Sequence, residues 1–131
     1  MASLFSKIIA GEIPCYKIAE TANCFAFLDI NPLSLGHTLV VPKIEIDNIF
    51  DLDMDLYQEL FGLAKTIAKA LEQLVDCKKV GVAVIGLEVP HAHIHLVPIN
   101  EVYDIDFKKP KLKLSSTEFE AIQSKIIAKL V

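Results

Sequence analysis

The sequence contains no arginine, so all thirteen of its cationic side chains are lysines. The guanidinium fork with which many proteins grip phosphate is therefore absent. Any phosphate bound here must be held by histidine, lysine, hydroxyl or backbone N–H groups. The formal net charge of −4 also argues against a nucleic-acid polymer as partner, because such binding depends largely on clustered basic side chains.

Cysteines and long apolar runs are also scarce. Cys15, Cys24 and Cys77 are scattered without a C-x-x-C pair, so they predict neither a disulfide framework nor a zinc ribbon. The longest apolar run, residues 80–87, is much shorter than a bilayer span. The N-terminus shows no basic segment followed by an apolar core and a cleavage site. We therefore expect a reduced, cytoplasmic protein that does not act at a membrane.

The pattern of apolar residues predicts a single α+β domain over residues 1–131, with no repeat or linker. Leucine and isoleucine recur at spacings of three and four over about 53–75, which is typical of an amphipathic helix. Shorter terminal helices are expected at about 4–10, capped by Ser3, and after Ser116. Strands are expected at about 15–20, 24–29, 37–41, 80–85 and 91–97. This order favours a sheet of about five mainly antiparallel strands.

Three of the four histidines, His91, His93 and His95, lie within five residues. Because side chains alternate along a strand, the three imidazoles should line one surface while Ala92 and Ile94 face the core. Such a row could bind zinc. Alternatively, a neutral imidazole could attack phosphorus while its neighbours donate hydrogen bonds or protons. The spacing alone leaves both uses open.

The segment 91–97 reads HAHIHLV and resembles the signature of the histidine triad (HIT) family, in which histidine alternates with apolar residues. Residues 5–14, 25–32 and 36–43 are similar to that family's opening segment and central strands. The resemblance covers nearly the whole chain. It implies the HIT-like fold, a purine nucleotide or nucleotide conjugate as ligand, no required cofactor, and a homodimer formed edge to edge.

By this resemblance, His93 would be the nucleophile that attacks the α-phosphorus of a nucleotide. A covalent nucleotidyl-histidine would form, and water would then release a nucleoside monophosphate. His95 and His37 would lie near the phosphate oxygens, where donors stabilise the transition state. His91 would orient its neighbours.

The nucleoside end of the ligand is also implied by matching positions. Asp29 matches the acidic residue that accepts hydrogen bonds from the ribose hydroxyls, although it could simply begin the turn before residues 31–32. Five apolar residues match the base pocket, and each could instead belong to the core: Phe5, Ile8, Phe27, Ile30 and Leu39.

The chain departs from the family pattern just before the first motif histidine. Residues 86–90 read GLEVP where relatives carry a polar pair, so Leu87 or Glu88 replaces the side chain expected near the phosphate. Glu88 either points to solvent or donates a proton to a leaving amine. Lysines 108, 109, 111 and 113 either supply positive potential at the mouth of the site or form a solvated segment.

These observations favour hydrolysis of a nucleoside 5′-phosphoramidate or a related conjugate. A dinucleoside polyphosphate hydrolase, a non-catalytic purine-nucleotide-binding module and a zinc-dependent protein remain alternatives. The leaving group stays undetermined, because its pocket is expected in the irregular segment 100–114 and the C-terminus.

Overall fold

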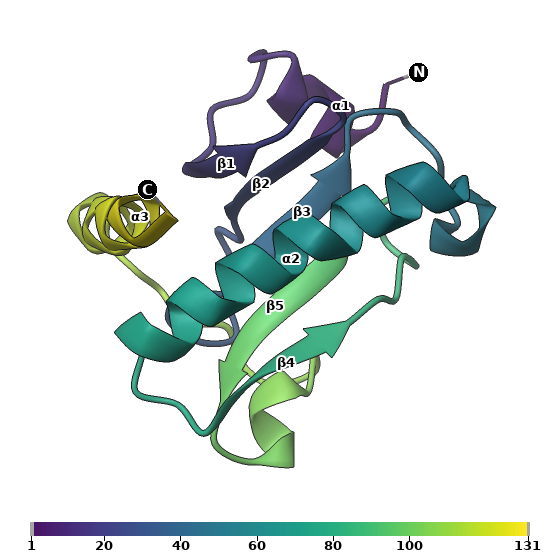
Figure 1. The fold of residues 1–131 in the computed structure, drawn as a ribbon. Coiled ribbons are helices and arrows are strands. Elements are labelled where there is room, and N and C mark those ends of the chain that lie inside the picture. Colours follow the sequence, from purple (N-terminus) through teal and green to yellow (C-terminus); the bar gives the residue numbers. More distant parts are fainter. Residues whose placement is uncertain (1, 131) are drawn as a thin grey trace.

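The computed structural model of the protein describes residues 2–130 and contains one five-stranded sheet (Figure 1). Its strand order is β1-β2-β3-β5-β4, and every neighbouring pair is antiparallel. The strands are β1 (Lys17–Glu20), β2 (Cys24–Leu28), β3 (Thr38–Pro42), β4 (Lys79–Ala83) and β5 (Ile94–Ile99). The expected α+β class and antiparallel sheet are thereby confirmed.

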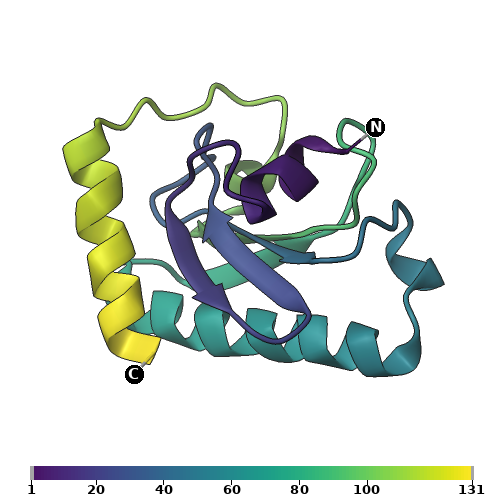
Figure 2. The same cartoon turned by 90° about the horizontal axis from the view of Figure 1, so that it is seen from above.

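The helices cover the two faces of the sheet unequally, as Figure 2 shows. The long helix α2 (Met54–Leu74) crosses one face, and the short helix α1 (Leu4–Ile9) lies over the opposite face. The C-terminal helix α3 (Ser116–Leu130) packs beside α2 and β1. Two short 3₁₀ turns, Ile49–Asp51 and Val102–Ile105, complete the described chain. No helix within residues 2–130 combines the length and apolar character needed to cross a bilayer.

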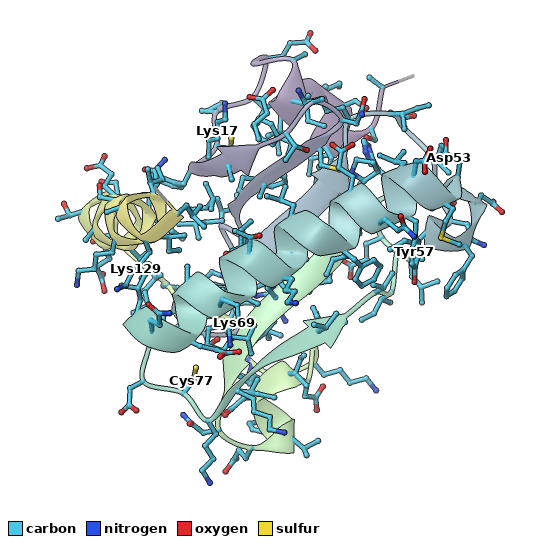
Figure 3. The ribbon with its side chains drawn as sticks, in the orientation of Figure 1. Lys17, Asp53, Tyr57, Lys69, Cys77 and Lys129 are labelled. Carbon is cyan, nitrogen blue, oxygen red and sulfur yellow. The ribbon has the colours of Figure 1, made fainter. Side chains whose placement is uncertain are left out.

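Helix α2 begins where its sequence predicts. The side chain of Asp53, labelled in Figure 3, accepts a hydrogen bond from the Leu56 N–H at 2.8 Å and so caps the helix. The apolar face of α2 then packs on the sheet through Leu60, Ile67 and Leu71, which are fully buried. The apolar residues of α2 recur at spacings of three and four because they form one continuous buried face of the helix.

Alternation along the strands divides the interior into two clusters. On β2, Ala26 and Leu28 join the larger cluster beneath α2, whereas Phe25 and Phe27 face α1. The smaller cluster, on the α1 face, consists of Phe5, Ile8, Phe25, Phe27, Leu39 and Val41. The α1 face is also the face to which β5 presents His95, because Leu39 is the cross-strand partner of His95.

The predicted boundaries of the last two strands are wrong. β4 ends at Ala83 instead of Ile85, and β5 begins at Ile94 instead of His91. The reason is that the backbone before Ile94 bonds outside the sheet: His91 N–H donates to Val89 O at 2.8 Å, and Ala92 N–H donates to Ile46 O at 2.7 Å. The alternation of faces persists nevertheless, since Ala92 and Ile94 are buried in the larger cluster.

Candidate active site

The backbone fixes the protonation state of His93. Its Nδ1 lies 2.7 Å from the carbonyl oxygen of His91, and a carbonyl can only accept a hydrogen bond. The ring proton therefore sits on Nδ1, and Nε2 carries a free lone pair. Burial lowers the pKa of His93 from its ordinary value of 6.5, although the hydrogen bond to His91 acts in the opposite direction. His93 is thus a neutral imidazole with a nucleophilic Nε2 at neutral pH.

A second chain of hydrogen bonds fixes His37 and His95. The Leu33 N–H donates to His37 Nδ1 at 3.0 Å, so the proton of His37 must sit on Nε2. That Nε2 lies 3.0 Å from His95 Nδ1, which leaves the proton of His95 on its own Nε2. Burial lowers the pKa of His37 to about 3 and the pKa of His95 to about 4. His95 is therefore a neutral ring that can donate an N–H to an anion.

His91 has a different environment from the other motif histidines. It is fully buried, and its Nε2 donates to the carbonyl oxygen of Pro42 at 2.7 Å. Its Nδ1 lies 2.8 Å from the hydroxyl oxygen of Ser3. Both ring nitrogens are thus occupied by protein groups, and His91 does not line the cavity that the other three histidines share. This placement is consistent with an orienting role.

The other predicted residues gather around one cavity of about 620 Å³ on the α1 face of the sheet. Besides His37, His93 and His95, its lining includes Phe5, Ile8, Phe27, Asp29, Ile30, Leu39 and Glu88. Four of the five predicted base-pocket residues are also buried in the smaller cluster, but Ile30 is 63% exposed at the rim. Glu88 is exposed and also lines the cavity.

Asp29 begins the turn after β2, as one of its two interpretations predicts, and it also lines the cavity. One carboxylate oxygen, Oδ1, accepts a hydrogen bond from the Asn31 N–H at 2.9 Å and so holds the turn after β2. The other, Oδ2, lies 3.6 Å from His37 Nε2. Burial raises the pKa of Asp29 above its ordinary value. The turn thus fixes the orientation of the carboxylate and leaves Oδ2 to meet a ligand.

The sequence did not point to Phe107, which closes one side of the site. Its ring lies edge-on to His95, with centroids 4.7 Å apart, and 6.2 Å from the ring of His37. Segment 106–112 returns to the site because Leu112 N–H donates to Pro32 O at 2.8 Å. Phe107 could not be predicted as a site residue, because a single aromatic residue in a charged, irregular segment belongs to no periodic pattern.

The four lysines of this segment separate into two pairs. Lys108 and Lys111 line the cavity. Lys109 instead lies 3.6 Å from the carboxylate of Asp104, and Lys113 is exposed outside the lining. Two ammonium groups, and not four, can therefore add positive potential to the site.

Asp29, His37 and His95 also offer three potential metal ligands within 4.8 Å of one another. The hydrogen bonds around His37 do not fit a metal, however. Its Nδ1 lone pair is occupied by the Leu33 N–H, so Nε2 carries the proton and has no lone pair to offer. A resident metal would require His37 to lose this proton or to rotate away from Leu33.

Comparison with known proteins agrees with this geometry. The model of the HIT domain family matches residues 10–102. The chain belongs to the HIT family. Adenosine 5′-monophosphoramidase hnt1 of Schizosaccharomyces pombe is 34% identical to this HIT protein over 132 residues, covering 99% of both chains.

Two solved structures show the same fold. A Hit-like protein of Bartonella henselae, involved in cell-cycle regulation, superposes with a TM-score of 0.82 at 28% identity, covering 97% of this chain and 95% of the other. A Zn-bound histidine triad family protein of Mycobacterium smegmatis also gives a TM-score of 0.82, at 25% identity, covering 99% of this chain and 94% of the other.

Proposed function

We propose that this HIT protein hydrolyses nucleoside 5′-phosphoramidates or related nucleotide conjugates at the α-phosphorus, and that it releases a nucleoside monophosphate. The observation that carries the proposal is the Nδ1-protonated, neutral ring of His93, which lines a cavity that also holds Asp29 and an apolar wall. The similarity to an adenosine 5′-monophosphoramidase supports the choice of a phosphoramidate.

In the first step, His93 Nε2 forms a bond to the α-phosphorus and the bond from phosphorus to the leaving nitrogen breaks. The His91 carbonyl stabilises the positive charge that develops on the ring of His93, because it accepts a hydrogen bond from the Nδ1–H. The Nε2–H of His95 donates to a non-bridging phosphate oxygen. The leaving nitrogen takes up one proton from solvent water, directly or through Glu88, which is exposed and lines the cavity.

In the second step, water attacks the phosphorus and breaks the bond to His93. One proton of the water is released to solvent. The neutral ring of His93 is restored, and the nucleoside monophosphate is released. Splitting the displacement in this way replaces one difficult substitution by two easier ones. The low pKa values of His37 and His95 keep both rings neutral throughout.

The nucleoside occupies the remainder of the cavity in this proposal. Asp29 accepts hydrogen bonds from the ribose hydroxyls through Oδ2. The purine ring packs between Phe5, Ile8 and Phe27, which form the apolar wall nearest to α1. An aromatic wall of this kind suits a flat base and makes few hydrogen bonds to distinguish one purine from another.

A dinucleoside polyphosphate is the second candidate substrate, and it would use the same nucleophile. The observation that favours it is the pair Lys108 and Lys111 in the cavity lining, because ammonium groups suit an anionic leaving group better than a neutral amine. A comparison of the two substrate classes on the same enzyme distinguishes these candidates.

We also propose that the protein is a homodimer that uses the edge strand β4. Val82 on β4 is 55% exposed, and Phe50, which lines a hollow together with Val84 and Ile85 just beyond β4, is 80% exposed. Exposed apolar side chains that gather in one patch mark an interaction site, whereas scattered ones need no partner. Sedimentation or light scattering measures the mass directly, and a monomer would contradict this proposal.

The test of the activity is AMP release from adenosine 5′-phosphoramidate, measured for the wild type and His93→Ala in the presence of EDTA. We expect chelator-resistant turnover that disappears in the variant, and a reaction stopped with alkaline detergent, which spares a P–N bond, should contain AMP covalently bound to the wild type alone. Circular dichroism of both proteins controls for folding. Absence of wild-type turnover would contradict the proposal, and turnover lost only with EDTA would indicate a metal enzyme.

A further inference from the structure

We propose that Ser3 is a positioning residue for the reaction, because its hydroxyl orients His91 and thereby the carbonyl oxygen that accepts the hydrogen bond from the Nδ1–H of His93. The inference rests on the proposed function of His93. It assigns to the N-terminus of α1 a role that extends beyond starting a helix.

The direction of each hydrogen bond on His91 follows from its partners. Pro42 O accepts only, so His91 Nε2 carries the ring proton, and Nδ1 of the neutral ring must accept from the Ser3 hydroxyl. Ser3 is only 7% exposed and His91 is fully buried, which limits competition from water. The other acceptor near the Ser3 hydroxyl, Ser6 Oγ, is farther away at 3.3 Å, so the shorter bond to His91 is favoured. The Ser3–His91 contact joins residues 88 positions apart at a distance of 2.8 Å.

Ser3 is itself held from two sides. Its hydroxyl oxygen accepts the Ser6 N–H at 3.1 Å, as an N-cap does, and its own N–H donates to Glu45 Oε1 at 2.6 Å. The same carboxylate oxygen accepts the Ser6 hydroxyl at 2.8 Å. These bonds, the one from the Ser3 N–H first, lower the pKa of Glu45 and keep it ionised. Glu45 lies in the connection between β3 and α2, so α1 is tied to the part of the chain that also contacts segment 91–92.

Helix α1 also touches the nucleophile directly. The Phe5 ring lies edge-on to His93, with centroids 4.9 Å apart, and 5.8 Å from the ring of His91. Phe5 and Ile8 line the cavity in which the base would bind. The same short helix therefore carries a wall of the base pocket and the hydroxyl that orients His91. Loss of the hydroxyl should misalign His93 relative to the bound nucleotide.

The experiment separates this orientation from ordinary helix capping. Ser3→Ala and Ser3→Gly both remove the hydroxyl, but glycine is a much better N-cap than alanine. Ser3→Thr keeps the hydroxyl. Asp53→Ala removes the cap of α2, which lies on the opposite face of the sheet from α1, and is the matched control. Each variant is assayed for kcat and KM with adenosine 5′-phosphoramidate.

We expect kcat to fall on the order of 10-fold in both Ser3→Ala and Ser3→Gly, because small misplacements of a reacting group are costly. KM should change less than kcat, Ser3→Thr should recover most of the rate, and Asp53→Ala should leave kcat near wild type. A normal kcat in Ser3→Gly would overturn the inference, since it would attribute the effect of alanine to capping. An equal loss in Asp53→Ala would overturn it too.

A second readout does not depend on turnover. Nitrogen-15 NMR of the ring atoms reports which nitrogen of His91 and His93 carries the proton. In the wild type we expect the Nε2–H form of His91 and the Nδ1–H form of His93, and in Ser3→Ala a mixture at His93. An unchanged His93 spectrum in Ser3→Ala overturns the role of Ser3. If the wild type has no phosphoramidase activity, the proposed function fails, and this spectrum still decides the orientation.

Discussion

Acidification between pH 6.5 and about 4.5 should destabilise the protein through the buried pair His37 and His95. Both rings have an ordinary pKa of 6.5, which burial lowers to about 3 for His37 and about 4 for His95. In this pH window the unfolded chain binds protons on these histidines and the folded chain does not. The free energy of unfolding therefore falls as the pH falls, and their contribution is fully present only above pH 6.5.

The magnitude follows from the number of protons involved. Each histidine that is protonated only when unfolded lowers the free energy of unfolding by about 1.4 kcal/mol per pH unit. Across these two pH units the pair contributes at most about 6 kcal/mol, a large share of the 5–15 kcal/mol typical of a domain. The lowered pKa of His93 acts in the same direction, whereas the raised pKa of Asp29 opposes it at the acidic end.

Urea unfolding monitored by far-ultraviolet circular dichroism measures this dependence, since the chain has no tryptophan to report by fluorescence. Protein concentration must be held constant, because an oligomer adds its own dependence. His37→Gln should reduce the slope by about 1.4 kcal/mol per pH unit, because it removes one of the two rings that titrate. A slope that is the same in wild type and His37→Gln would refute the reasoning.

Two further predictions concern the ligand and the closing segment. Asp29→Asn should raise KM for adenosine 5′-phosphoramidate on the order of 10-fold and lower kcat less, because one charge-assisted acceptor for the ribose is lost. Equal KM values for the wild type and Asp29→Asn would exclude a ribose contact. Phe107→Ala should admit water to the ring of His95. Because burial causes the low pKa of His95, NMR titration of this variant should find that pKa closer to 6.5. The control Tyr103→Ala, in the 3₁₀ turn Val102–Ile105 and outside the cavity lining, should leave the pKa of His95 unchanged.

Most of the fold could be predicted from periodicity. The helix expected at 53–75 matches α2 (Met54–Leu74), since a spacing of three and four is produced by a helix packed on one face. The start of β5 could not be predicted in the same way. Residues 91–93 keep the alternation of a strand, but Val89 O and Ile46 O take the N–H groups of His91 and Ala92, and no local pattern encodes those partners.

The candidate site likewise contains residues that the sequence identifies and residues that only long-range contacts reveal. Its histidines and Asp29 were identifiable because they belong to short motifs, and the cavity brings His37, His93 and His95 together. Phe107 and the Ser3–His91 bond were not identifiable, because their partners are 12 or more residues away and their neighbours in sequence carry no regular pattern. Long-range contacts of this kind depend on how the elements pack.

The sequence by itself determined the class of fold, the residue types available for phosphate chemistry, and the alternation that separates imidazoles from the core. These properties follow from local geometry, because side-chain direction repeats with the period of a helix or a strand. Only the tertiary structure decided which nitrogen of each histidine carries its proton. The carbonyl of His91 and the N–H of Leu33 make that assignment for His93 and His37, and a backbone group can do so only when folding has placed it at hydrogen-bond distance from the ring.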